Sequence, residues 1–382
     1  MTGLSAAAAG IAVAAGRRAE AAERRREVDP AVMAAVVEAG FARHFAPAAL
    51  GGREGSFAEL VDAVGVVAGE CPATAWCASL IAGIARMAGA YLPTDGQAEV
   101  WASGPDAVLV GSVTPFGTAE PRPGGWLLSG RWPYMSAVAY SDWAIVCGVA
   151  QSGTATEGWL FAVPRSAYRV EDTWFSVGMA ATGSNTLVAA DVFVPEHRAF
   201  KRADLIEGRL DDFTGGAPAC YRAPLPAVNG LMFAAPAVGA AQGMARTFAA
   251  AFADKLGSGQ LPGTVGVQGV RASAELALAR SAGEADAARL LLDRAAGLAD
   301  RCASPGGAMS RLDAARNLRD CSLATDLAVT AVDRLFRQAG TRGQATSGPM
   351  QRLWRDVTAV STHVALQFEP AARGYVEQLV KQ

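Results

Sequence analysis

The sequence has little of what metal centres and disulfide frameworks require. Only three of its 382 residues are histidine, at positions 44, 197 and 363, and none forms an HxxxH or HExxH motif. Zinc sites are built mainly from such histidines and from closely spaced cysteines. The six cysteines are scattered without a CxxC pair, which is typical of reduced thiols in a cytoplasmic protein. We therefore expect neither a metal site nor a disulfide.

An excess of charge and long apolar runs are also missing. The formal net charge is -2 with both signs interspersed, so we expect neither a nucleic-acid partner nor binding to an anionic membrane. The alanine-rich start has no basic residue before its apolar run and continues into the charged residues 17–27. This pattern predicts a solvated helix rather than an export signal. No other window of about 18 residues is strongly apolar, so no transmembrane helix is expected.

What is present falls into three parts, because 382 residues are too many for one hydrophobic core. Residues 1–107 are expected to form an N-terminal helical domain. Its clearest helix start is Asp29, which is followed by Pro30 at the first helical position. The helices are expected at about Ser5–Glu27, Pro30–Glu38, Phe57–Gly69, Ala73–Ala90 and Thr94–Trp101.

From about Val108 the pattern changes to that of strands. Six short β-type runs separated by Gly/Pro turns extend to Val194, and the first three include Val108–Val113, Trp126–Ser129 and Trp143–Val149. Pro121–Gly125 is expected to form the turn between the first two. Strands without intervening helices predict a small antiparallel β-barrel or sandwich. We assign residues 108–212 to this central β domain.

The remainder of the chain is helical again. Four long segments, at about Val228–Lys255, Gln268–Cys302, Leu312–Ala339 and Met350–Val380, carry alanine and leucine on one face. Helices of this length predict an antiparallel four-helix bundle, which we place in residues 213–382. The fold class is therefore α+β, in the order helical domain, small antiparallel β-barrel domain, four-helix bundle.

Hydroxyl and aromatic side chains gather between the first three strands. Such groups suit a flat ligand with a polar edge, because aromatic faces can stack on it and hydroxyls can meet its edge. A half-buried sheet with polar turns is the alternative interpretation. The residues in question are Ser112, Thr114, Thr118, Ser129, Trp132, Tyr134, Ser136 and Tyr140.

Two motifs, in this order, resemble the acyl-CoA dehydrogenase superfamily, and the resemblance covers almost the whole chain. GSVTPFGTAEP with SGRWPYMSAVAYSDW is similar to the flavin-contacting part of its β domain, and RQAGTRGQATSGPMQRLWRDVTAVSTH, residues 337–363, to its last-helix signature. The resemblance implies a homotetramer in which this signature helps to bind the flavin across a subunit interface. It implies flavin contacts for Ser112, Thr114, Trp132, Tyr134, Ser136, Gly340, Arg352, Arg355 and Asp356.

The stretch after Arg355 and Asp356 indicates the branch of the superfamily. Dehydrogenases often carry a catalytic Glu there in a YEGT context, whereas this chain has VTAVSTHVALQ. R-D followed by six residues and His363 resembles instead the flavin-dependent monooxygenases of the same fold. This implies an oxygenase component that uses reduced FMN or FAD and dioxygen to hydroxylate a small molecule, at carbon or nitrogen, through a flavin hydroperoxide.

The reduced flavin is expected to come from a separate reductase. The glycine-containing stretch GSGQLPG at 257–263 has no strand before it, so nothing in the chain resembles a dinucleotide fold for NADH.

His363 is the expected acid/base, and Ser112 is the second expected catalytic residue. An imidazole, with an ordinary pKa near ~6.5, can deprotonate the substrate or hydrogen-bond the hydroperoxide. Seven positions separate Asp356 from His363, so on a continuous helix the two would share a face. The alternative is a lone histidine with a purely structural role.

Two departures from the branch bear on the substrate. The resemblance places Ala85 where phenol-hydroxylating members carry a His, and their S-G-C-D-H run is Ser136–Tyr140 here. A simple phenol is therefore not expected. Arg86, Tyr140 and Tyr221 suit an anionic or polar polycyclic natural product, or an amine, as in antibiotic biosynthesis. The alternative interpretation is that Arg86 is a surface residue whose apolar stem lies along the helix and whose charged end reaches water.

Two other functions stay open at this point. An acyl-CoA dehydrogenase or another FAD-dependent desaturase would hold oxidised FAD tightly and pass electrons to an acceptor. A flavin-binding relative without chemistry would be indifferent to the replacement of His363.

Overall fold

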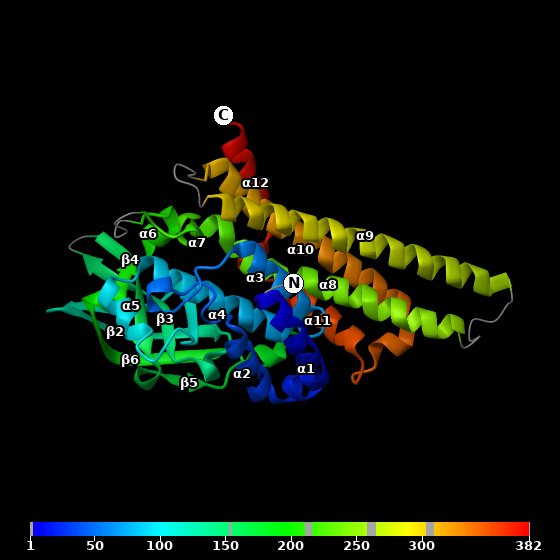
Figure 1. Cartoon of the computed structure of the whole chain (residues 1–382), viewed down its shortest axis with the longest axis horizontal. Helices are drawn as coiled ribbons and strands as arrows, with labels where there is room; N and C mark the ends of the chain where they lie inside the picture. The colour runs from blue at the N-terminus through cyan, green and yellow to red at the C-terminus, as the bar shows by residue number, and fades with distance from the viewer. Residues whose placement is uncertain (1–2, 153–154, 211–215, 258–264, 303–308, 382) are drawn as a thin grey trace.

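The structure is a computed structural model that describes residues 3–152, 155–210, 216–257, 265–302 and 309–381. The sheet lies at one end of the molecule and three long C-terminal helices extend toward the other (Figure 1). The N-terminal helices lie largely between them, against both the sheet and the long helices. The boundary expected between residues 212 and 213 lies outside the described residues.

The five predicted N-terminal helices are confirmed, and local signals explain where they begin and end. They are α1 (Leu4–Arg25), α2 (Pro30–Ala39), α3 (Phe57–Ala68), α4 (Pro72–Tyr91) and α5 (Thr94–Val100). The Asp29 carboxylate caps α2 by accepting a hydrogen bond from Ala31 N at 3.0 Å. The helix ends at Gly40, whose φ of 96° is a conformation that glycine adopts without strain.

Helix α4 is the central helix of the hydrophobic core. Contrary to the hydropathy expectation, it is long and apolar enough to cross a membrane by length and composition alone. However, 94% of its most apolar window is buried inside the protein. Its apolar side chains are therefore used against α3, α8 (Leu225–Gly257) and the first strand of the sheet.

One sheet contains all seven strands of the described chain: β1 (Leu109–Arg122), β2 (Gly125–Met135), β3 (Trp143–Ser152), β4 (Ala155–Pro164), β5 (Arg169–Glu171), β6 (Asn185–Pro195) and β7 (Ala199–Lys201). Their order is β5-β6-β2-β1-β3-β4-β7. β1 and β3 are parallel, whereas the other neighbours are antiparallel. Because β5 and β7 do not pair with each other among the described residues, the predicted antiparallel barrel is not confirmed.

The first hairpin is longer than the sequence indicated. β1 continues past Val113 to Arg122, and Pro115 lies in it between two shifts of the pairing with β3. Such irregular positions are where a strand tolerates proline. Arg122 pairs with Gly125, so the predicted turn narrows to Pro123 and Gly124.

Three long helices and several short ones form the C-terminal part. After α6 (Arg202–Glu207) and α7 (Ala219–Arg222) come α8, α9 (Val265–Arg301) and α10 (Arg311–Ala339). The predicted fourth long helix is wrong in one respect, because it is divided into α11 (Pro349–Ser361) and α12 (Phe368–Leu379) by the short 3-10 helix η7 (Val364–Leu366). Another 3-10 helix, η6 (Gly340–Gln344), joins α10 to α11.

Hydroxyl groups explain why α11 ends where it does. Ser361 Oγ and Thr362 Oγ1 donate back to the carbonyls of Thr358 and Ala359 at 2.8 and 2.7 Å, and such bonds compete with continuation of a helix. His363 is then extended, with φ -65° and ψ 134°. It follows that Asp356 and His363 do not share a helix face, as the sequence spacing had suggested.

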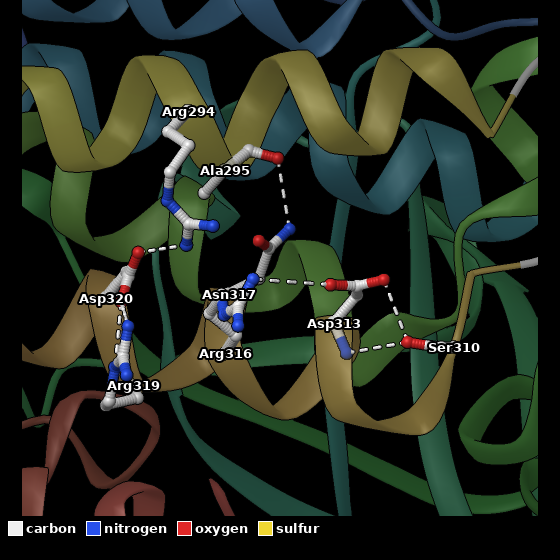
Figure 2. A network of polar contacts seen from close by, with 8 residues as sticks. All are labelled: Arg294, Ala295, Ser310, Asp313, Arg316, Asn317, Arg319 and Asp320. Atoms are coloured by element: carbon white, nitrogen blue, oxygen red, sulfur yellow. Dashed lines mark hydrogen bonds and ion pairs between the residues drawn. The ribbon is translucent and has the colours of Figure 1, made fainter. Parts of the chain in front are cut away.

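A buried polar network joins the long helices (Figure 2). Asp320 in α10 is fully buried and forms ion pairs with Arg294 of α9 and with Arg319. Asn317 Nδ2 donates to Ala227 O at 3.2 Å and to Ala295 O at 3.0 Å. The network therefore connects α8, α9 and α10 at one level of the bundle.

Candidate active site

An imidazole packs against two aromatic rings from different parts of the chain, and these two rings also contact each other, at 5.1 Å between centroids. The His363 ring stacks on Phe233 of α8 at 4.0 Å between centroids, and its edge contacts Trp76 of α4 at 5.6 Å. Loss of water contact lowers the pKa of His363 to about 4. The imidazole is therefore neutral at neutral pH.

The hydrogen bonds of His363 also define which nitrogen carries the proton. Its Nδ1 accepts a hydrogen bond from Ala365 N at 3.2 Å. In a neutral imidazole the other nitrogen then holds the proton. His363 consequently offers an Nε2–H donor, which supports the hydrogen-bonding alternative for this residue better than the base alternative.

A chain of buried hydroxyls begins at the same tryptophan. Trp76 Nε1 donates to Ser136 Oγ at 3.0 Å, Ser136 and Ser184 are 2.8 Å apart, and Ser184 and Thr182 are 2.6 Å apart. Thr182 Oγ1 donates to the carbonyl of Met179 at 2.8 Å. Since the Thr182 proton is used on the Met179 carbonyl, Ser184 must donate to Thr182 and Ser136 must donate to Ser184. Ser136 Oγ can therefore only accept a hydrogen bond from a further partner.

The loop that holds these hydroxyls is fixed to α11. Met179 has a positive φ of 56°, and its N–H donates to Asp356 Oδ1 at 2.6 Å. A Cβ on Gly178 would lie 2.3 Å from the Arg355 carbonyl oxygen, so only glycine permits this approach. Asp356 thus positions the loop that carries Thr182 and Ser184.

Replacement of Asp356 by asparagine tests this contact through the pH dependence of stability. Burial raises the pKa of Asp356 to about 6, so the folded state holds the proton more tightly than the unfolded state does. In the wild type, the contribution of the Asp356 carboxyl group to the free energy of unfolding is present below about pH 4 and is lost as the pH rises through 6. Asparagine keeps an acceptor for Met179 N–H but does not ionise. We expect the variant to gain stability relative to the wild type, by about 3 kcal/mol, between pH 4 and pH 7.

Urea unfolding at both pH values measures this difference. A constant difference between the two proteins across the pH range would contradict the assignment.

The two arginines of α11 differ in their surroundings. Arg355 is well partnered, because it forms an ion pair with Glu23, donates twice to Gln351 Oε1 at 2.8 and 2.7 Å, and also reaches the carbonyl of Val177. Arg352 is only 7% exposed, and its Nε has no hydrogen-bond partner within the described residues. Arg352 is therefore the arginine of the motif that has unused binding capacity.

The predicted residues of the sheet are placed unevenly. Trp132 is fully buried and its Nε1 donates to Cys147 O at 2.8 Å, so its ring offers no exposed face. Tyr134 is 70% exposed, with a positive φ of 65°. Ser112 is half-buried and Thr114 is exposed on β1. A ligand can thus stack on the exposed ring of Tyr134 but not on the buried ring of Trp132.

Gly340 lies apart from the histidine cluster. It begins η6, next to a cavity of about 560 Å³ lined by the ends of α8 and α10, by η6 and by the start of α11. Phe248 lines this cavity and lies 15 positions after Phe233 on α8, which corresponds to about 22 Å along a helix. The motif residues therefore mark two separate places rather than one pocket.

The three predicted substrate contacts all use their polar atoms on backbone carbonyls. Arg86 is 2% exposed and donates to Cys220 O at 2.5 Å, to Tyr221 O at 3.0 Å and to Ala223 O. Tyr140 donates to Val28 O at 2.6 Å and Tyr221 to Phe45 O at 2.7 Å. The surface interpretation of Arg86 is thus wrong, and its role toward a substrate stays a prediction.

Sequence reasoning missed several members of the cluster. Trp76 and Phe233 lie in apolar helices where they read as ordinary core residues, and no local signal distinguishes them. Thr182 and Ser184 lie within a stretch of mostly small residues, GMAATGSN at 178–185. The hydroxyls in that run were a usable signal, but their partners are far away in the sequence.

Comparisons with known proteins agree on one family. A model described as acyl-CoA dehydrogenase, C-terminal domain, matches residues 231–368. The chain is 33% identical, over 362 residues, to the oxygenase component of FADH(2)-dependent resorcinol hydroxylase from Rhizobium sp. (strain MTP-10005), and the alignment covers 91% of this chain and 86% of the relative.

Solved structures give the same result. The chain superposes on 3-HSA hydroxylase from Rhodococcus sp. RHA1 with a TM-score of 0.91 and 26% identity, covering 100% of this chain and 97% of that one. XiaF from Streptomyces sp., solved in complex with FADH2 and glycerol, gives a TM-score of 0.89 and 28% identity, with coverage of 99% and 95%.

Proposed function

Since the chain belongs to the oxygenase components of two-component flavin-dependent monooxygenases, which share the acyl-CoA dehydrogenase fold, we propose that it hydroxylates a natural-product small molecule at carbon or nitrogen, through a flavin hydroperoxide. As a member of this family it is a monooxygenase that uses reduced flavin and dioxygen. A separate reductase supplies the reduced flavin. One oxygen atom enters the substrate and the other leaves as water, with the electrons taken from the flavin.

The donor set of the described residues fits a flavin. Tyr134 presents an exposed aromatic face at the end of β2, and the nearby Ser136 keeps an acceptor for an N–H group. We propose that Ser112, Thr114, Tyr134 and Ser136 hold the flavin ring. Gly340, Arg352, Arg355 and Asp356 then hold the rest of the cofactor or the segments around it.

The observation that carries the proposal is the neutral His363 packed against Phe233 and Trp76. A dehydrogenase needs a carboxylate base at the reacting carbon, whereas this cluster supplies a neutral N–H donor in an apolar setting. A hydrogen bond from Nε2–H to oxygen at the reacting centre would assist transfer of that oxygen and release of the other as water.

The same cluster supports an aromatic substrate. Two aromatic rings in contact with each other also contact the imidazole, and Ala85 on α4 is fully buried. The site therefore lacks the second histidine that the phenol-hydroxylating relatives were expected to carry. We propose a planar substrate larger than a simple phenol, recognised mainly through its faces.

Stopped-flow absorbance tests the proposed reaction. The protein with photoreduced FMN or FAD is mixed with oxygenated buffer, first without substrate and then with candidate aromatic compounds. We expect an absorbance band of the flavin hydroperoxide that decays faster when a substrate is present, together with hydroxylated product. Tight binding of oxidised FAD with electron transfer to an acceptor, and no oxygenated product, would instead establish the desaturase alternative.

A further inference from the structure

A second, polar cavity of about 300 Å³ lies where α1, the end of α3, α8 and the start of α11 meet. It is lined by Gly16, Arg17, Glu20, Gly69, Glu70, Thr247, Ser347, Pro349, Arg352 and Leu353. Thr247 lies 14 positions after Phe233 on α8, which is about 21 Å along a helix. The cavity is therefore distinct from the histidine cluster.

Arg352 is the buried charge of this cavity. Its side chain is 7% exposed, its Nε has no hydrogen-bond partner, and none of the ion pairs among the described residues includes it. An arginine that is removed from water and left without a partner destabilises the folded state. Arg355, three positions later on the same helix, is by contrast paired with Glu23 of α1 and with Gln351 of α11.

The charges around the cavity favour an anion. Glu20 is already paired with Arg24. A Cβ on Gly69 would lie 2.2 Å from Arg246 Nη2, so this guanidinium also reaches the cavity wall. The guanidinium groups of Arg17 and Arg352 and the carboxylate of Glu70 line the cavity, and none of the ion pairs among the described residues includes these three side chains.

The start of α11 adds backbone donors. Gly348 precedes the helix, and no side chain caps it. The Gln351 amide is turned instead to the carbonyls of Thr346 and Gly348, at 3.0 and 2.9 Å. The first backbone N–H groups of α11 are therefore uncapped by side chains, at the end of the helix dipole that attracts negative charge.

We propose that this cavity binds a small tetrahedral oxyanion of the phosphate type, held by Arg352 and by the start of α11. The oxyanion would satisfy the orphaned Nε, and the hydroxyls of Ser347 and Thr247 lie in the wall to donate to it. The oxyanion site itself does not rest on the proposed reaction, whereas a flavin phosphate as its occupant rests on the proposed function, in which Arg352 holds part of the cofactor. The ligand is either free phosphate or the phosphate of a flavin, and the test separates these sources.

Thermal unfolding in phosphate and in chloride, at equal ionic strength, tests the site. Inorganic phosphate at about ten times its Kd should raise the Tm of the wild type by about 2 °C. Arg352→Met should show no phosphate response, and in chloride it should be at least as stable as the wild type, because it removes an unpaired buried charge. Arg334→Met is the matched control, since Arg334 is paired with Glu284 in another part of the bundle. The control should keep the phosphate response.

Arg352→Lys provides a second variant that keeps the charge, and it should retain a weakened phosphate response. An equal Tm rise in the wild type and both Arg352 variants, or no rise in the wild type, would overturn the proposal.

Oxidised riboflavin and FMN identify the source of the oxyanion. If FMN abolishes the phosphate response and riboflavin does not, the site binds the flavin phosphate. If the response persists with both, the site binds free phosphate. A phosphate response in a protein that forms no hydroxylated product would leave this inference standing and overturn the proposed reaction alone.

Discussion

Replacing His363 by alanine is expected to lower the rate of substrate hydroxylation by about 100-fold or more, while reduced flavin is still oxidised by dioxygen. A positioned acid or base typically contributes a factor of this size. The variant loses the Nε2–H donor but keeps Phe233 and Trp76. We therefore expect uncoupling, in which hydrogen peroxide replaces hydroxylated product. Product and peroxide, measured in the same reaction, give the result.

The control for this variant is His197→Ala. His197 is a half-exposed residue whose Nε2 lies 3.0 Å from Glu99 Oε1, far from the cluster in the sequence. Its replacement should leave the ratio of product to peroxide unchanged. An unchanged ratio in His363→Ala as well would remove His363 from the proposed mechanism and would favour the relative without chemistry.

The lowered pKa of His363 has a consequence for the pH profile. The imidazole is neutral above its folded pKa of about 4, so its protonation should not shape the hydroxylation rate between pH 5.5 and 8. The stability that depends on neutral His363 is fully present above pH 6.5 and is lost as pH falls through 4. A rate change centred near pH 6.5 that disappears in the variant would contradict this picture.

The second large effect is expected in the bundle, from loss of both arginines that face Asp320. Arg294→Ala with Arg319→Ala leaves the fully buried carboxylate of Asp320 without a cation. Breaking a buried ion pair in this direction costs about 3 to 5 kcal/mol of stability. The free energy of unfolding in urea measures it.

Removal of the carboxylate should cost less than removal of the cations. Arg294 and Arg319 have side chains that are 37% and 26% exposed, so they can be hydrated when Asp320→Ala takes their partner away. The triple variant, which lacks all three charges, should recover much of the loss seen in the double arginine variant. A double arginine variant as stable as the wild type would show that Asp320 does not depend on these partners.

Local patterns were sufficient for the type and order of the elements. Asp29 and Ser56 cap their helices as such residues do in any context, because the contacts lie within three positions. The division of the last helix was missed, since it depends on Ser361 and Thr362 bonding back to their own turn. The barrel was predicted and is not confirmed, because closure of a sheet depends on pairing between its two end strands, which no local pattern contains.

The candidate site was predictable in identity but not in geometry. The sequence motif singled out His363, Ser136 and Asp356, and the structure places Ser136 and Asp356 on the two ends of one hydrogen-bonded chain. The sequence could not show that Trp132 is buried in the core or that Arg86 donates to backbone carbonyls of α7, because those contacts depend on how the sheet and the helices pack.

By itself, the sequence determined the α+β class, most of the helical and strand segments and the resemblance to flavin-dependent monooxygenases, and it proposed His363 as a site residue. These follow from periodicity, caps and motifs, which involve neighbours in the chain. Tertiary structure alone decided that His363 is neutral where it packs against Phe233 and Trp76, and that Asp356 holds Met179, 177 positions away. Desolvation and long-range hydrogen bonds come from residues that meet only when all the elements pack together.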